Sequence, residues 1–166
     1  IVGDSVVAGL GLLVPLSDTA LATDTVRIEA VVCRRLSDDG CLHQGFRPIP
    51  VTEILAQADW RDIDRVVIAA GYNDGHLPSC APRVSAALPS ESGSARLWWM
   101  TFAERGEFAE RYAQHNQYLR EAFSKELIDW EIASRGNGEW FQPDGIHLTE
   151  SGATAMAAVI AQVVLP

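Results

Sequence analysis

The spacing of apolar residues changes repeatedly along this chain, between runs that suit buried strands and stretches that suit amphipathic helices. A buried parallel strand is apolar along most of its length, whereas a helix that covers a sheet is apolar on one face only. Alternation of the two patterns is typical of a parallel sheet with helices on both faces. We therefore expect an α/β fold.

Four runs rich in apolar and β-branched residues are candidate strands, and a short fifth run begins the chain. They are residues 26–32, 65–71, 95–102, 126–133 and 1–2. Helical spacing of apolar residues marks residues 108–123 and, after Thr149 as an N-cap, residues 153–164. Loops are expected at 88–94 and 134–138, where small and turn-forming residues gather. Because these loops are too short to link independent domains, we expect one domain spanning residues 1–166.

Composition and motif spacing exclude several classes of protein. Acidic residues number 22 against 13 basic ones, and the net charge of −9 repels a polyanion, so we expect no nucleic acid partner. The single lysine, Lys125, stands in no glycine-rich loop, which excludes a P-loop. The four histidines follow no metal-binding spacing, so neither a metal nor a cofactor is expected. No stretch approaches the roughly 18 consecutive apolar residues of a membrane span, so we expect no integral membrane protein.

Three cysteines, Cys33, Cys41 and Cys80, allow at most one internal disulfide. Cys33 and Cys41 bracket the turn-forming run Asp38-Asp39-Gly40, which allows their sulfurs to meet if the loop doubles back. The sequence leaves two alternatives open, this disulfide or three reduced thiols. A disulfide favours an extracytoplasmic or secreted protein, which is our expectation, and a cytoplasmic location stays open.

Three short motifs lie where expected strands end or an expected helix begins. They are Gly3-Asp4-Ser5 after the first strand, Gly71-Tyr72-Asn73-Asp74 at the end of a central strand, and Asp144-Gly145-Ile146-His147 before the last helix. In an open α/β sheet the carboxyl ends of parallel strands line one crevice, so these distant motifs converge in space. A serine at a strand-to-helix turn suits a nucleophile, because the helix N-terminus favours the negative charge that develops there.

In these motifs and their order, the sequence resembles the SGNH/GDSL hydrolase family, named for its Ser, Gly, Asn and His, over nearly the whole chain. The run 144–149 is most similar to bacterial cell-envelope SGNH domains, some of which are joined to membrane acyltransferases. The resemblance implies a three-layer α/β/α, flavodoxin-like fold with a parallel sheet of about five strands. It also implies a serine esterase that acts on O-acyl esters through an acyl-enzyme. We expect acetyl groups, because no long apolar lid segment is evident to shelter a fatty chain.

The resemblance assigns the catalytic roles residue by residue. Ser5 is the expected nucleophile, His147 the general base, and Asp144 the acid that orients the imidazole. The expected oxyanion-hole donors are the backbone N–H of Ser5, the side chain of Asn73 and the backbone N–H of Cys33. At the position of Cys33 the family carries a glycine, so the side chain either narrows the acyl pocket or turns away, tied to Cys41.

Other residues near the motifs receive supporting roles. We expect Gly71 in the substrate site, and Trp140 either as a wall of the acyl or sugar pocket or as a core aromatic. The resemblance marks the position of Asp4 without making it the triad acid, and a local hydrogen-bonding role is at least as well supported. Trp98 and Trp99 are expected to pack under the sheet.

Two further functions remain open beside hydrolysis of a small-molecule or glycan ester. The same triad serves an O-acyltransferase that transfers the acyl group to a cell-envelope sugar hydroxyl, in association with a membrane acyltransferase. A non-catalytic envelope-binding module with the same fold is the third alternative, favoured by the short first strand and by Cys33.

Overall fold

The computed structural model describes residues 1–23, 25–89, 93 and 95–165. Five parallel strands form one sheet in the order β2-β1-β3-β4-β5, which is the flavodoxin-like order. The strands are β1 (Val2–Gly3), β2 (Glu29–Ala30), β3 (Arg65–Ala69), β4 (Arg96–Met100) and β5 (Leu127–Ile128). The predicted α/β fold with a parallel sheet of about five strands is confirmed. The expected single domain over residues 1–166 stays a prediction.

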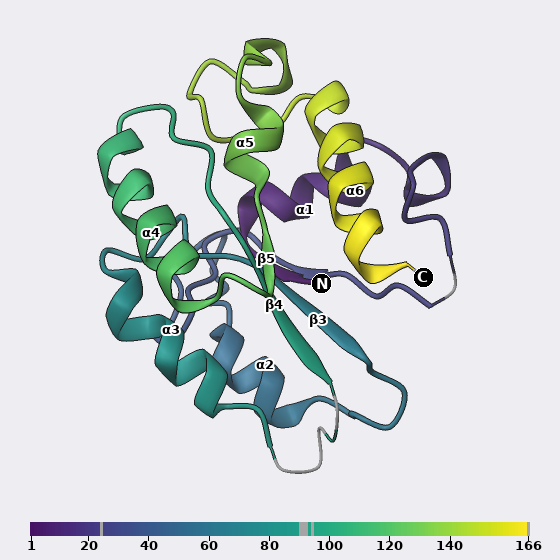
Figure 1. Cartoon of the computed structure of the whole chain (residues 1–166), viewed down its shortest axis with the longest axis vertical. Coiled ribbons are helices and arrows are strands. Elements are labelled where there is room, and N and C mark those ends of the chain that lie inside the picture. Colours follow the sequence, from purple (N-terminus) through teal and green to yellow (C-terminus); the bar gives the residue numbers. More distant parts are fainter. Residues whose placement is uncertain (24, 90–92, 94, 166) are drawn as a thin grey trace.

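Helices cover both faces of the sheet, which gives the three layers expected (Figure 1). They are α1 (Ser5–Leu12), α2 (Val51–Gln57), α3 (Leu77–Ala86), α4 (Ala109–Ala122), α5 (Trp130–Ser134) and α6 (Glu150–Val164). Figure 1 shows α1 and α6 on one face and α2, α3 and α4 on the other, with contacts α1·α6, α2·α3 and α3·α4. Within the described residues, no helix combines the length and apolar character needed to cross a membrane.

The core lies between the sheet and these helices. Val67 and Ile68 of β3 and Trp99 of β4 are fully buried, and Trp99 stacks on Phe123 at 5.2 Å between ring centroids. Helix α6 turns a regular stripe to the sheet, formed by Ala153, Met156, Ala157 and Ile160. This stripe is the one that the sequence predicts. Burial of each large apolar side chain contributes roughly 1.5–3 kcal/mol relative to leaving it in water.

The predicted strand at 126–133 is correct only at its start. β5 ends at Ile128, and Asp129 then caps α5, with its carboxylate accepting a hydrogen bond from the Ile132 N–H at 3.2 Å. The same carboxylate pairs with Arg120 of α4 at 2.9 Å. A helix cap and an ion pair therefore override the strand preference of the apolar residues in this segment.

The other predicted strands and loops differ in length. β2 covers Glu29–Ala30 within the predicted 26–32, because β1 offers only Val2 and Gly3 as parallel partners. Of the predicted loop 88–94, residues 90–92 and 94 lie outside the described residues. The predicted loop 134–138 runs from the end of α5 into a short 3-10 turn, Gly138–Trp140. Thr149 caps α6 as predicted, accepting from the Gly152 N–H at 3.3 Å.

The carboxyl ends of β1 and β3 lie side by side. Gly3 pairs with Ala30 of β2 on one side and with Ala69 of β3 on the other. The segments that leave these three strands therefore emerge at one edge of the sheet, where strand order reverses and open α/β sheets form their crevice.

Candidate active site

Ser5 is the first residue of α1 and directly follows the turn out of β1. The turn is tight, because a Cβ at Gly3 would lie 2.5 Å from the Cβ of Val7. The side chain of Asp4 caps the helix by accepting from the Val6 N–H at 3.1 Å. The Ser5 hydroxyl is thereby placed at the start of a helix, where the backbone dipoles favour negative charge.

A continuous chain of hydrogen bonds joins Ser5, His147 and Asp144. Oγ of Ser5 lies 3.1 Å from Nε2 of His147, and Nδ1 of His147 lies 2.6 Å from Oδ2 of Asp144. With a proton on Nδ1, the imidazole donates to the carboxylate and accepts from the serine hydroxyl. The structure therefore brings together the three residues that the sequence predicts as catalytic. The side chains of His147 and Asp144 are 42% and 45% exposed, so the relay is open to solvent on one side.

The second oxygen of Asp144 fixes the direction of the carboxylate. Oδ1 accepts from the backbone N–H groups of Ile146 at 2.8 Å and His147 at 2.9 Å. Partial burial raises the pKa of the Asp144 carboxyl, but the hydrogen bonds from the His147 ring and these two N–H groups outweigh it and hold the pKa below its ordinary value. Asp144 is therefore ionised at neutral pH.

Two glycines let the loop that carries His147 pack against the segment between β4 and α4. A Cβ at Gly145 would lie 2.8 Å from the Gly106 nitrogen, and a Cβ at Gly106 would collide with the backbone oxygen of Asp144. Both glycines also have positive φ angles, of 72° and 69°. The backbone of the loop that carries His147 therefore packs directly on the backbone at Gly106, which limits the movement of the loop relative to Ser5.

Asp4 is fully buried and makes the local hydrogen bonds expected of it. Besides the Val6 N–H, its carboxylate accepts from the N–H groups of Gly71 and Tyr72, both at 3.1 Å. Burial raises the pKa of Asp4 to about 6, against the lowering effect of these hydrogen bonds. Asp4 thus joins the turn before Ser5 to the turn after β3.

The three predicted oxyanion-hole donors lie at the ends of neighbouring strands. Among the described residues, no acceptor bonds the backbone N–H of Ser5 or of Cys33. Asn73 donates one amide hydrogen of Nδ2 to the Arg34 carbonyl at 3.0 Å, and its second hydrogen remains available. Val31, two residues before Cys33, donates its N–H to the Gly3 carbonyl at 3.3 Å, which brings the segment after β2 beside the turn that carries Ser5.

Cys33 and Cys41 form a disulfide, with their Cα atoms 5.2 Å apart. Of the two alternatives that the sequence leaves open, the structure contains the cross-link. Cys80 is reduced and buried. Cys33 itself has a φ of +69°, a left-handed conformation that suits glycine.

Two residues that sequence reasoning did not assign hold the segment after Cys33. The carboxylate of Asp74 accepts from the Leu36 N–H at 3.2 and 3.3 Å, and burial raises its pKa. The buried guanidinium of Arg34 donates to the carbonyls of Glu29 at 2.6 Å and Gly3 at 3.3 Å. Asp74 stands in a recognised motif, which is a signal for some role. No sequence signal marks Arg34, because a single arginine is expected at the surface unless its hydrogen-bond partners are known.

Gly71 and Trp140, predicted in the substrate site, both have structural contacts. Gly71 has a φ of +131°, and a Cβ there would lie 2.7 Å from the ring of Phe102. Trp140 is half-buried and stacks on Trp130, with ring centroids 5.8 Å apart and planes 14° apart. These contacts explain why a glycine stands at 71 and a tryptophan at 140. A role of either residue in substrate binding stays a prediction.

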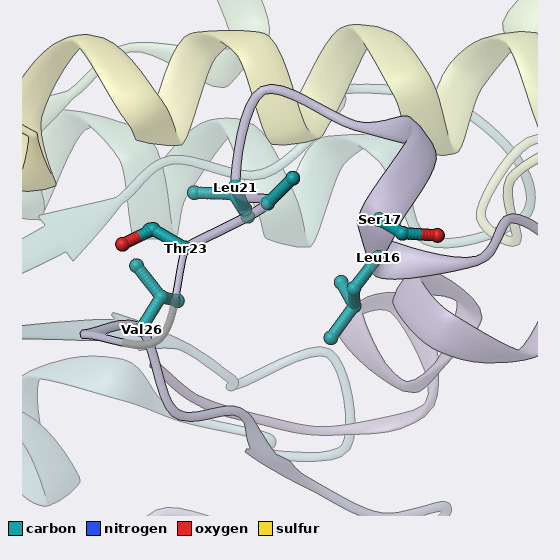
Figure 2. Close-up of a pocket in the computed structure, with 6 residues that line it drawn as sticks. Leu16, Ser17, Leu21, Thr23 and Val26 are labelled. Carbon is teal, nitrogen blue, oxygen red and sulfur yellow. The ribbon is translucent and has the colours of Figure 1, made fainter.

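Two hollows lie away from the three residues of the relay. The one in Figure 2, of about 520 Å³, is lined by Leu16, Ser17, Leu21, Ala22, Thr23 and Val26. A larger one, of about 680 Å³, lies beside the first residues of β3, which pair with β4 but not with the short β1. Neither is lined by Ser5, Asp144 or His147.

Comparison with known proteins gives one short sequence match and several whole-chain structural matches. No family model matches the chain. Over 37 residues, 22% of its length, it is 43% identical to peptidoglycan O-acetyltransferase OatA of Listeria monocytogenes, of which the match spans only 6%.

Three solved structures resemble nearly the whole chain. The C-terminal catalytic domain of Streptococcus pneumoniae OatA has a TM-score of 0.71 and 21% identity, covering 98% of this chain and 89% of that one. A lipolytic protein of the G-D-S-L family from Veillonella parvula has a TM-score of 0.59 and 17% identity, covering 98% and 95%. An acetylxylan esterase from Geobacillus stearothermophilus has a TM-score of 0.57 and 15% identity, covering 97% and 90%. At these identities the likeness concerns the fold. The resemblance predicted from the motifs is confirmed at that level, and the chain has the fold of the SGNH/GDSL hydrolases.

Proposed function

We propose that this protein is a serine-dependent enzyme that cleaves or transfers O-acetyl groups, with Ser5, His147 and Asp144 as its catalytic triad. The observation that carries the proposal is the unbroken hydrogen-bond chain from Ser5 through His147 to Asp144 at the carboxyl edge of the sheet. The backbone N–H groups of Ser5 and Cys33 support it, because they have no acceptor among the described residues and acyl transfer needs donors for the oxyanion.

In the first half of the reaction, Oγ of Ser5 attacks the ester carbonyl while Nε2 of His147 takes the hydroxyl proton. The carbonyl oxygen becomes an oxyanion, held by the N–H groups of Ser5 and Cys33 and by the Asn73 amide. His147 then gives its proton to the leaving alkoxide as the ester bond breaks, which leaves Ser5 acetylated. Asp144 stabilises the imidazolium that exists between these two proton transfers.

In the second half, an acceptor hydroxyl attacks the acetyl-enzyme while His147 takes its proton and returns it to Oγ of Ser5. Water as the acceptor releases acetate, and a sugar hydroxyl yields a new ester. Transfer to a glycan is the second candidate function, favoured by the two matches to proteins named OatA and by the exposure of His147. In that case a membrane acyltransferase is the proposed source of acetyl groups. The Cys33–Cys41 disulfide supports an extracytoplasmic location for either reaction.

Hydrolysis of p-nitrophenyl acetate by the native protein and by Ser5→Ala tests the proposal. We expect kcat to fall at least about 10³-fold in the variant, because it lacks the nucleophile. A serine-directed fluorophosphonate should modify the native protein at Ser5 only, as read by mass spectrometry of its peptides. Equal, near-background rates for the two proteins would instead favour the non-catalytic envelope-binding module.

Hydrolysis and transfer are separated by the products. With p-nitrophenyl acetate as donor and soluble peptidoglycan fragments as acceptors, an acetyltransferase yields acetylated fragments at the expense of free acetate. An esterase yields acetate alone, at a rate that the fragments do not change.

A further inference from the structure

Residue 33 is held in a conformation that its side chain disfavours. Cys33 has a φ of +69°, and Gln44 is the other described non-glycine residue with a positive φ. In this left-handed region a Cβ approaches the neighbouring backbone oxygen, so that residues other than glycine readily relax out of it. A residue other than glycine therefore needs a constraint from its surroundings to stay in this conformation.

The residues on either side of Cys33 are anchored to the sheet, but Cys33 is not. On the N-terminal side Val31 donates to the Gly3 carbonyl at 3.3 Å. On the C-terminal side Arg34 holds the backbone of β1 and β2, and Asp74 holds the Leu36 N–H. The Arg34 N–H and the Val31 carbonyl close a turn around Cys33 at 3.4 Å. The contacts of Cys33 itself are the disulfide and a hydrogen bond from the Cys41 N–H to its carbonyl at 3.3 Å.

The segment that carries Cys41 is itself held by hydrogen bonds. Gly40 exchanges hydrogen bonds with the segment 47–48, donating its N–H to the Pro48 carbonyl at 3.2 Å and accepting from the Arg47 guanidinium at 3.0 Å. The Gly40 backbone lies so close to Cys33 that a Cβ at Gly40 would be 2.5 Å from the Cys33 carbonyl oxygen. Residues 40–41 therefore contact the carbonyl of Cys33, and its N–H has no acceptor among the described residues.

We propose that the Cys33–Cys41 disulfide positions the oxyanion hole: it holds residue 33 in the left-handed conformation, so that the backbone N–H of Cys33 faces the carbonyl under attack by Ser5. A glycine would adopt the left-handed conformation at residue 33 unaided, whereas Cys33 is kept in it by the cross-link. Cys41 is thereby a positioning residue, which acts through the N–H of Cys33. This inference rests on the proposed acyl-transfer function and adds to it a requirement for the oxidised pair.

Two double variants that differ by one methyl group test the inference. Cys33→Ala/Cys41→Ala removes the cross-link and keeps a Cβ at residue 33, whereas Cys33→Gly/Cys41→Ala removes both. For p-nitrophenyl acetate we expect kcat of the alanine pair to fall on the order of tenfold to a hundredfold, with KM changed less than about threefold. The glycine pair should recover kcat to within about threefold of the native value, because glycine adopts the left-handed conformation unaided. Both variants lose the same cross-link, so a shared drop in Tm does not explain a difference in kcat.

Gln44→Gly is the matched control, since it places a glycine at the other left-handed residue of the same loop without touching the cross-link. Its kcat should equal that of the native protein. Native kcat in the alanine pair, or equal losses in the alanine and glycine pairs, would overturn the inference.

Crystal structures of the two double variants give a readout that does not depend on turnover. We expect a negative φ at residue 33 in the alanine pair and a positive φ in the glycine pair. A positive φ in both would overturn the inference even if activity fell. Absence of Ser5-dependent turnover in the native protein would refute the proposed function instead, and these structures would still decide whether the disulfide sets the conformation.

Discussion

Three aspartates stand in the motifs, and burial separates their roles. Asp4 and Asp74 are 0% and 3% exposed and accept hydrogen bonds from backbone N–H groups, so they hold turns together. Asp144 is 45% exposed at its side chain and faces the imidazole of His147. The sequence predicts the difference between Asp4 and Asp144 through the family resemblance. Residue type alone does not, because an aspartate in a turn commonly hydrogen-bonds the nearby backbone, and a role as triad acid depends on which imidazole it faces.

Asp144→Asn should lower kcat by about 10²–10⁴-fold. Because two backbone N–H groups hold Oδ1, the asparagine oxygen takes that place and its NH₂ group faces Nδ1 of His147. The ring is then held with its proton on Nε2, which prevents it from accepting the Ser5 proton. Steady-state kinetics with p-nitrophenyl acetate measure the effect. Asp59→Asn, at an exposed and distant ion pair, should leave kcat unchanged, and a mild effect of Asp144→Asn would argue against a triad acid at this position.

Asp4→Asn should remove a dependence of stability on pH. The pKa of Asp4 is about 6 in the folded protein and about 4 when unfolded, so the folded state binds the proton more tightly. The contribution of Asp4 to stability is therefore greatest below pH 4 and is lost as pH rises towards 6, by roughly 3 kcal/mol. Urea unfolding between pH 4 and 7 measures it. The native protein should lose its advantage over the variant across this range, and a constant difference would contradict the expected shift.

At the scale of elements, the segment 141–148 depends on α6 for its position. The Gly152 Cα in the first turn of α6 faces the Trp140 backbone, and the Thr149 N–H donates to the Trp140 carbonyl at 3.0 Å. The Gln142 N–H donates to the His147 carbonyl at 2.8 Å, which closes the segment on itself. His147 is therefore held by the contact between one helix end and one backbone turn.

Gly152→Ala should destabilise the protein and lower its activity together. The added Cβ would collide with the Trp140 carbonyl oxygen, a backbone atom that cannot rotate away, so α6 must shift from the segment that carries His147. We expect a loss of about 1–3 kcal/mol in the free energy of unfolding and at least a tenfold fall in kcat. Urea unfolding and steady-state kinetics check the two effects. Thr154→Ala, on the exposed face of the same helix, should change stability by less than about 0.5 kcal/mol.

The elements differ in how far the sequence predicts them. β3, β4, α4 and α6 follow their apolar patterns to within a few residues, because each buries a regular stripe or run. The segment 126–133 does not, because Asp129 serves both as a helix cap and as the partner of Arg120 in α4. The second role depends on where α4 lies, which no local pattern contains.

At the scale of the whole molecule, the strand order brings the ends of β2, β1 and β3 together, and one cross-link ties the segment after β2. The two cysteines are 8 residues apart in sequence, with a Cα separation that suits a disulfide. Closing a loop of this size restricts the unfolded chain and stabilises the fold by about 2–3 kcal/mol.

Dithiothreitol should therefore lower the urea midpoint of the native protein, by an amount equivalent to about 2–3 kcal/mol. The Cys33→Ala/Cys41→Ala variant should have the lower midpoint already and not respond to the reductant. An equal response of both proteins would show that the effect of the reductant does not come from the Cys33–Cys41 cross-link.

The sequence by itself determined the fold class, the flavodoxin-like order through the family resemblance, and the residues that meet at the relay. Hydrophobic periodicity and motif order can both be read directly from the sequence. Parallel strands bring their carboxyl ends together regardless of their exact lengths. Tertiary structure alone decided whether Cys33 and Cys41 form a disulfide, that Cys33 is left-handed, and that Arg34 and Asp74 hold its neighbours. These features depend on contacts between segments that meet only after the sheet has formed. No single segment of the sequence therefore predicts them.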